Sequence, residues 1–203
     1  MTVISKRVFR PLPGKAALAQ SRVRRLSEII ARLGGSVRVG AVVWGDGARD
    51  LHLYGVFENV QAGAKVFSAL SEDEDALRLR AESEDELASQ WEGPEIWRTV
   101  YGRPRPDYPV MLQREYSMDR RNLKRAVEMI PEIQTLDPNM PIIGVVPVVS
   151  SDMARFMVGY YAKSLEDLGE AIDRVGMSET FQAIVVRAAE LGTLTKARAI
   201  RNV

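Results

Sequence analysis

The sequence has no cysteine among its 203 residues and a single histidine, His52. Without cysteine the chain can form no disulfide, use no thiolate nucleophile and bind no metal through a thiolate. A transition-metal site built from several imidazoles is excluded as well, because only one is present. The acidic residues near the middle of the chain show no metal-ligand spacing, and these are Asp73, Asp75, Glu84 and Asp85. We therefore predict no metal site.

Other familiar signals are also missing. No stretch approaches the roughly 18 apolar residues of a membrane span. The first fourteen residues, MTVISKRVFRPLPG, lack the apolar core of a signal peptide. No GxGxxG, phosphate-binding loop or GxSxG motif occurs. We expect a cytoplasmic protein with no membrane partner.

Charge is nearly balanced overall but unevenly distributed. The net charge is +1. Ten Lys or Arg and two acids lie between Lys6 and Arg49, and eight acids and two arginines lie between Glu72 and Glu86. This pattern indicates either a basic face for anions or RNA, or a solvated helix face that pairs with the acidic stretch. We favour internal pairing and expect no nucleic-acid partner, because no aromatic-plus-basic module accompanies the charges.

The pattern of apolar residues predicts the order βαββαβ twice. Strands are expected where β-branched residues alternate, and helices where apolar residues recur every three or four positions. The first unit has strands at 2–12, 37–44, 51–57 and 94–101 and helices at 15–33 and 60–83, the second with an expected break at SEDED. The second unit has strands at 110–116, 142–149, 155–162 and 192–200 and helices at 120–136 and 165–190. The expected domains are 1–103 and 110–203, with a proline-rich linker at 104–109.

A shift of 104 residues aligns the two units without gaps between Arg10 and Phe57. Gly40 then falls on Gly144 and Gly55 on Gly159, and Arg10 becomes the equivalent of Arg114. A period near 100 residues is too long for a solenoid, whose repeats run about 20 to 50 residues. The sequence therefore predicts two copies of a small domain.

Each βαββαβ unit predicts an antiparallel sheet with two helices on one face. The strand residues of Ile142–Val149 are apolar almost without interruption, as expected for a strand buried on both faces. The uncovered face of one sheet must be buried, and the second unit offers a matching face. The fold class is therefore α+β, with two ferredoxin-like repeats whose sheets pack into a pseudo-twofold barrel with helices outside.

Three stretches carry a resemblance to a known superfamily. They are RLGGSVRVGAVVWGDGARDLHLYGVFEN (32–59), MPIIGVVPVVSSD (140–152) and GYYA (159–162). The pattern resembles the dimeric α/β-barrel superfamily in a tandem, fused form, and the first half looks most like its NIPSNAP-like and monooxygenase-like bacterial members. Members of this superfamily include cofactor-free monooxygenases, lactone isomerases, heme enzymes and ligand-binding domains, so the resemblance leaves the chemistry open. The axial histidine of the heme members lies in a later helical part of the chain, where this sequence has none, so we expect no cofactor.

Several polar residues are candidates for a site in the first half. Residues two apart on a strand share a face, so Arg38 and Trp44 should point together, as should His52 and Tyr54. We predict His52 and Tyr54 as catalytic, His52 moving a proton near neutral pH. The predicted substrate-binding residues are Arg10, Arg38, Trp44 and Arg114, with an arginine fixing a carboxylate or enolate. The alternative is that Trp44 and Tyr54 are core residues and the arginines pair with acids.

The sequence supports two functions. In the first, the chain binds a small anionic or aromatic molecule, and the resemblance then implies cofactor-independent oxygenation or isomerisation if it is an enzyme. In the second, it is a non-catalytic module for assembly or ligand sensing. We also expect a homo-oligomer. A cavity of a few hundred Å3 beside these side chains would favour the first function, and a solidly packed layer between sheet and helices would favour the second.

Overall fold

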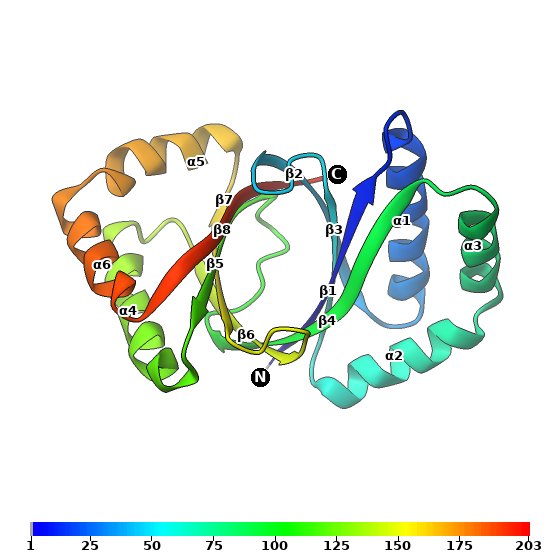
Figure 1. Ribbon diagram of the computed structural model, residues 1–203, viewed down its shortest axis with the longest axis horizontal. Helices are drawn as coiled ribbons and strands as arrows, with labels where there is room; N and C mark the ends of the chain where they lie inside the picture. Colours follow the sequence, from blue (N-terminus) through cyan, green and yellow to red (C-terminus); the bar gives the residue numbers. More distant parts are fainter. Residues whose placement is uncertain (1) are drawn as a thin grey trace.

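The computed structural model describes residues 2–203. Its eight antiparallel strands close into one barrel in the order β1-β3-β2-β8-β5-β7-β6-β4, with helices on opposite flanks (Figure 1). The strands are β1 (Val3–Pro11), β2 (Ser36–Gly45), β3 (Leu51–Phe57), β4 (Ser89–Tyr101), β5 (Val110–Met118), β6 (Ile142–Val149), β7 (Arg155–Ala162) and β8 (Gly192–Asn202). The predicted α+β barrel is confirmed.

The helices cover the outer surface of the barrel in two groups. The first group, beside β1–β4, comprises α1 (Ala16–Arg32), α2 (Val60–Glu72) and α3 (Glu74–Asp85). The second group, beside β5–β8, comprises η1 (Arg120–Asn122), α4 (Leu123–Leu136), α5 (Leu165–Ala171), η2 (Ile172–Gly176) and α6 (Glu179–Ala189). We call β1–β4 with their helices the first half and β5–β8 with theirs the second half. Within residues 2–203 no helix is long and apolar enough to cross a membrane.

Two seams join the halves. At one seam β2 pairs with β8, and Val42 lies opposite Ile200. At the other, β4 pairs with β6, and Trp97 lies opposite Pro147. The barrel interior contains an apolar cluster that draws side chains from both halves: Ile4, Val42, Tyr54, Trp97, Met111, Ile143, Val145, Met157, Tyr161 and Ile200. Each sheet therefore buries the open face of the other, as the sequence predicted.

Local sequence explains where the elements break. The expected interruption at SEDED occurs at Asp73, which ends α2 and caps α3 by accepting hydrogen bonds from the backbone of Asp75 and Ala76. Strand β4 begins at Ser89, five residues before the predicted start at Pro94. The register of β1 against β4 shifts opposite Gly93 and Pro94, a bulge that admits a proline to a sheet.

The predicted repeat of 104 residues is wrong by one position. In the first hairpin Val39 pairs with Leu53, and in the second Gly144 pairs with Val158. A shift of 105 residues therefore superimposes one hairpin on the other. A slip of one residue reverses the face of every side chain in a strand. A Cβ on Gly40 would meet Ile200 inside the barrel, whereas one on Gly144 would meet Ile130 of the outer layer.

The basic first helix pairs with the acidic stretch of the same chain. Arg25 binds Glu82, and Arg32 lies 2.9 Å from Asp75 and 3.1 Å from Asp73. The arginines lie on α1, Asp73 caps α3, and the other two acids lie within α3. Helices α1 and α3 pack side by side. The uneven charge distribution is therefore explained in large part by internal ion pairs, as favoured from the sequence.

Candidate functional site

The barrel interior brings together three of the predicted site residues. Arg38 of β2 and Tyr54 of β3 line one chamber, and His52 is fully buried beside Tyr54. His52 Nδ1 lies 2.8 Å from the Tyr54 hydroxyl. Burial, followed by the charges of Lys6 and Arg198, holds the pKa of His52 well below its usual range, so the imidazole is neutral at pH 7. The catalytic roles of His52 and Tyr54 stay a prediction.

The linker-end chamber has a volume of about 340 Å3 and is lined by Arg38, Tyr54, Gln113 and Tyr161 together with aliphatic and methionine side chains. Residue 103 and residues 104–106 of the linker form part of its wall. Burial raises the pKa of Tyr54 far above its usual value, so its hydroxyl stays protonated. The chamber therefore combines arginine and tyrosine side chains with a mostly apolar surface.

The opposite end of the barrel holds a polar chamber of about 420 Å3. Lys6 Nζ lies 2.9 Å from Glu115 Oε1, Arg198 Nη2 lies 3.2 Å from the same oxygen, and Arg155 binds Glu95. Burial lowers the pKa of Lys6 despite the nearby Glu115. Each of these three cations therefore lies beside a carboxylate, and none is left without a counter-charge.

The other predicted substrate-binding residues lie elsewhere. Trp44 is 49% exposed, because an extra residue between Val42 and Trp44 in the β2–β8 register turns it away from Arg38. Arg10 lies in the polar chamber and donates to Glu92 at 2.7 Å. Arg114 faces the outer layer, where its guanidinium lies 5.5 Å from the Tyr160 ring. The predicted equivalence of Arg10 and Arg114 is therefore wrong.

A cavity larger than either chamber lies where the sequence predicted none. Between the outer face of β1 and helices α1, α2 and α3 lies a cavity of about 860 Å3, which we call the sheet–helix cavity. Its apolar wall includes Phe9, Val23, Leu26, Phe67, Leu70, Leu79, Leu87 and Trp91. Arg7 of β1 and Arg80 of α3 also line it. Arg7 corresponds structurally to Arg114, because Arg7 pairs with Leu53 as Arg114 pairs with Val158.

Arg7 and Arg80 lie close together without a carboxylate partner. Within residues 2–203 neither forms an ion pair, and Arg7 lies 5.8 Å from the Phe67 ring. Burial and then the charge of Arg80 lower the pKa of Arg7. The third arginine of the lining, Arg22, donates to the backbone carbonyl of Glu82 at 2.8 Å. Like charges repel, and an anion bound between the half-buried Arg7 and the exposed Arg80 would remove that repulsion.

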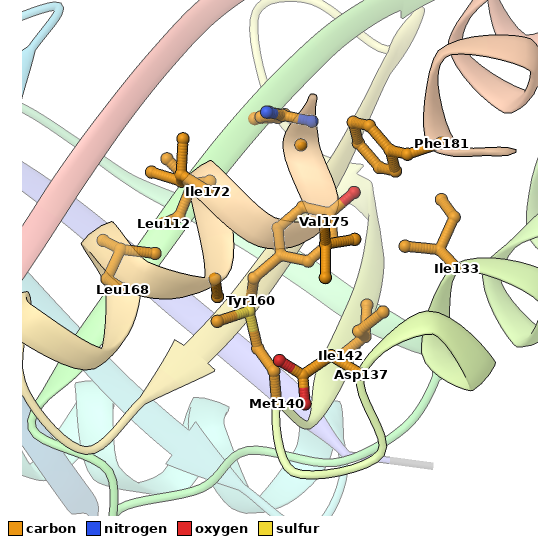
Figure 2. A pocket seen from close by; sticks show the side chains of 13 residues that line it. Leu112, Ile133, Asp137, Met140, Ile142, Tyr160, Leu168, Ile172, Val175 and Phe181 are labelled. Carbon is orange, nitrogen blue, oxygen red and sulfur yellow. The ribbon is translucent and has the colours of Figure 1, made fainter. Parts of the chain in front are cut away.

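The corresponding place in the second half is filled. Figure 2 shows the pocket there, where side chains from β5–β7 and from α4, α5, η2 and α6 converge. Its volume is only about 50 Å3. Phe181 lines this pocket, and its ring lies 5.6 Å from the Arg114 guanidinium. Of the two equivalent layers, only the one in the first half can hold an organic ligand.

A histidine-ligated heme does not fit this chain. The only imidazole, that of His52, is buried inside the barrel and bonded to Tyr54. The second-half pocket contains no histidine in its lining and is far smaller than a porphyrin requires. Within residues 2–203 no cluster of three His, Cys, Asp or Glu side chains could hold a metal ion.

No protein-family model and no curated protein matches the sequence. Solved structures with the same fold do match over nearly the whole chain. A candidate monooxygenase from Lactobacillus acidophilus is 10% identical, with a TM-score of 0.63 over 99% of this chain and 93% of its own. An anthrone oxidase-like protein is 10% identical, with a TM-score of 0.67 over 100% of this chain and 91% of its own.

A variant of chlorite dismutase from Candidatus Nitrospira defluvii is also 10% identical, with a TM-score of 0.57 over 100% of this chain and 91% of its own. At such low identity these similarities establish the barrel fold alone. The chemistry must therefore be argued from the side chains of this chain.

Proposed function

We propose that this protein binds a small organic anion with an extended apolar body in the sheet–helix cavity. The observation that carries the proposal is Arg7, a half-buried arginine without a carboxylate partner within residues 2–203, together with the exposed Arg80 in the lining of the same cavity of about 860 Å3. Ligand cavities of about 300–1,000 Å3 with mostly apolar walls and a few convergent polar groups are typical of small-molecule sites. The sheet–helix cavity meets each of these conditions.

The charges of the lining select an anion. Arg7, Arg22 and Arg80 contribute three positive charges, and Glu84 is the single carboxylate of the lining. Guanidinium groups bind carboxylate and related oxyanions through two parallel hydrogen bonds. Phe67, which lies beside Arg7, offers a flat apolar surface to a ring or chain attached to that anion. A carboxylate, enolate or phenolate on an aromatic or aliphatic body fits this combination.

We propose cofactor-independent oxygenation or isomerisation as the reaction class to test. Arg7 and Arg80 would stabilise negative charge on an enolate or phenolate oxygen, which makes the adjacent carbon more reactive. Glu84, an exposed residue of the same lining, would accept the proton. The structural similarity to proteins described as a candidate monooxygenase and as anthrone oxidase-like supports this choice.

Replacing either arginine by the uncharged methionine tests the binding site. The parent, Arg7→Met and Arg80→Met should be titrated with aromatic and medium-chain carboxylic acids and with the neutral amides of the same shape, by calorimetry and thermal shift. We expect the acids to bind the parent and the amides to bind at least tenfold more weakly. Loss of a charge-assisted hydrogen bond of about 1.5–3 kcal/mol predicts a 10- to 100-fold weaker acid complex in each variant.

Arg24→Met is the matched control. Arg24 is an exposed residue of α1 that does not line the cavity, so its variant should bind the acids as the parent does. Equal affinity of the parent and Arg7→Met for every acid would overturn the proposal. Turnover of an enolisable acid with oxygen uptake, lost in Glu84→Gln, would establish the proposed reaction class, and binding without turnover would leave a ligand-binding protein.

A further inference from the structure

We infer that the linker-end chamber inside the barrel is a second, independent site for a small carboxylate. Arg38 carries this inference. Its Nε and Nη2 atoms are buried and have no hydrogen-bond partner within residues 2–203. Its guanidinium lies 5.8 Å from the Tyr161 ring. Buried donors are rarely left without a partner in folded proteins, and a guanidinium is among the most costly groups to leave so.

Nothing in the chamber wall can neutralise Arg38. The lining contains no aspartate or glutamate, and it includes two further arginines, Arg103 and Arg105. Arg105 is paired with Asp107 at 2.6 Å, whereas Arg38 has no such partner within residues 2–203. Burial lowers the pKa of Arg38, which is the direction expected for a cation without a counter-charge. A ligand carboxylate would supply the missing acceptors.

A second polar group points to the same occupant. Gln113 lines the chamber, and its Oε1 atom is buried without a partner in the part of the chain that the structure describes. Its Nε2 atom lies 3.4 Å from the Tyr54 hydroxyl. The chamber therefore leaves donors unpaired at Arg38 and an acceptor unpaired at Gln113, so a carboxylic acid that also carries a hydroxyl or amino group would satisfy both.

The remaining wall fits an apolar body. Met111, Met157 and Ile143 supply a flexible apolar surface. Gly159 corresponds to Tyr54 of the first half, and Met111 and Ile143 pack over it, within 2.9 Å of the place that a Cβ would take. The volume of about 340 Å3 accommodates a molecule of one or two rings.

The linker covers this chamber. Residues 103–106 contribute to its wall, and the linker crosses the view between β3 and β5 in Figure 1. Arg105 stacks on Tyr108 at 4.6 Å, and Tyr108 packs against Tyr161 at 6.3 Å. A ligand would therefore enter beside the linker, whose Tyr108 contacts Tyr161, and Tyr161 in turn lies next to Arg38.

The two sites are separated by the barrel wall. Arg38 points into the barrel, whereas Arg7 lies on the outer face beneath the helices. Binding inside the barrel should therefore persist when the sheet–helix cavity has lost both arginines. This independence allows failure of one proposal to be distinguished from failure of the other.

The experiment uses the full chain carrying Arg7→Met and Arg80→Met. Titration calorimetry with benzoate, 4-hydroxybenzoate and 2-naphthoate, and with the matching amides, should show one site that prefers the acids at least tenfold. Adding Arg38→Met should weaken acid binding at least tenfold. Arg114→Met, which removes an arginine that contacts aromatic rings outside the chamber, should leave the affinity within twofold.

Far-UV and near-UV circular dichroism establish that each variant is folded, and Arg38→Lys provides a second variant that keeps the charge but offers a different hydrogen-bonding geometry. Both Arg38 substitutions are made in the Arg7→Met and Arg80→Met double variant. With Arg38→Lys added, the protein should bind the acids more weakly than the double variant does, but more tightly than with Arg38→Met added. Absence of acid binding in the double variant, equal binding of acids and amides, or unchanged binding after Arg38→Met would each overturn the second site.

Discussion

The single histidine is the residue whose protonation most directly reports on the barrel interior. Burial, followed by the charges of Lys6 and Arg198, lowers the pKa of His52 well below its usual value. In the unfolded chain the imidazole binds a proton below about pH 6.5. The unfolded state therefore binds more protons than the folded state in this range, and stability must fall as the pH falls.

This linkage predicts the effect of His52→Gln. The free energy of unfolding of the parent should fall below about pH 6.5 with a slope that approaches 1.4 kcal/mol per pH unit from this one group. The variant should lack that component, because glutamine does not titrate. Urea unfolding at pH 7.5, 6.5, 5.5 and 5.0 measures the difference in slope. Tyr54→Phe retains the imidazole and should retain the slope, and identical pH profiles for the parent and His52→Gln would show that His52 is charged or exposed.

At the level of whole strands, the close approach of β2 to β8 depends on a residue without a side chain. A Cβ on Gly40 would clash with Cγ2 of Ile200, which is fully buried and cannot move aside. Gly40→Ala should therefore destabilise the protein by about 1–3 kcal/mol, the usual cost of overpacking a core. Equilibrium unfolding in urea measures this loss.

Gly169→Ala is the matched control for the strand prediction. Gly169 lies within α5, and no atom would lie within 4 Å of an added Cβ. Alanine has a higher helix propensity than glycine by about 1 kcal/mol, so this variant should be unchanged or slightly more stable. A loss of stability in Gly169→Ala equal to that in Gly40→Ala would show that the effect is not specific to the β2–β8 contact.

The elements could be predicted from the sequence because their signals are local. The hairpin strands Leu51–Phe57, Ile142–Val149 and Arg155–Ala162 have the predicted bounds. Short apolar runs bounded by turns that contain glycine, serine or aspartate are sufficient to define them. The closed barrel followed because two apolar faces in one chain can cover each other.

The register and most of the site could not be predicted by the same reasoning. An ungapped alignment takes no account of the extra residue before Trp44, nor of the 105-residue spacing of the hairpins. Arg7 was missed because Lys6, Arg7 and Arg10 are equally basic in sequence, yet the strand places Lys6 inside and Arg7 outside. The alternation of faces along β1 was the signal that could have separated them.

For the molecule as a whole, stability depends on contact between the halves. The interior cluster contains Trp97 of the first half and Ile200 of the second, both fully buried. Neither half alone could bury its inner face, so exposing it would leave a large apolar surface in water. We propose that residues 1–103 and 110–203 are two structural units, joined by the linker 104–109, that are stable only as a pair.

Fragment complementation tests that proposal. Fragments 1–103 and 104–203, prepared separately, should each aggregate or self-associate, and mixing them after refolding should give a 1:1 complex by analytical ultracentrifugation. Trp97 would then become shielded from fluorescence quenchers, since its side chain lies at the β4–β6 seam in the intact barrel. Ile200→Asp in the second fragment places a charge in the shared core and should abolish the complex. If each fragment were instead a folded monomer that does not bind the other, the two units would be independent domains. The proposal that they are stable only as a pair would then be wrong.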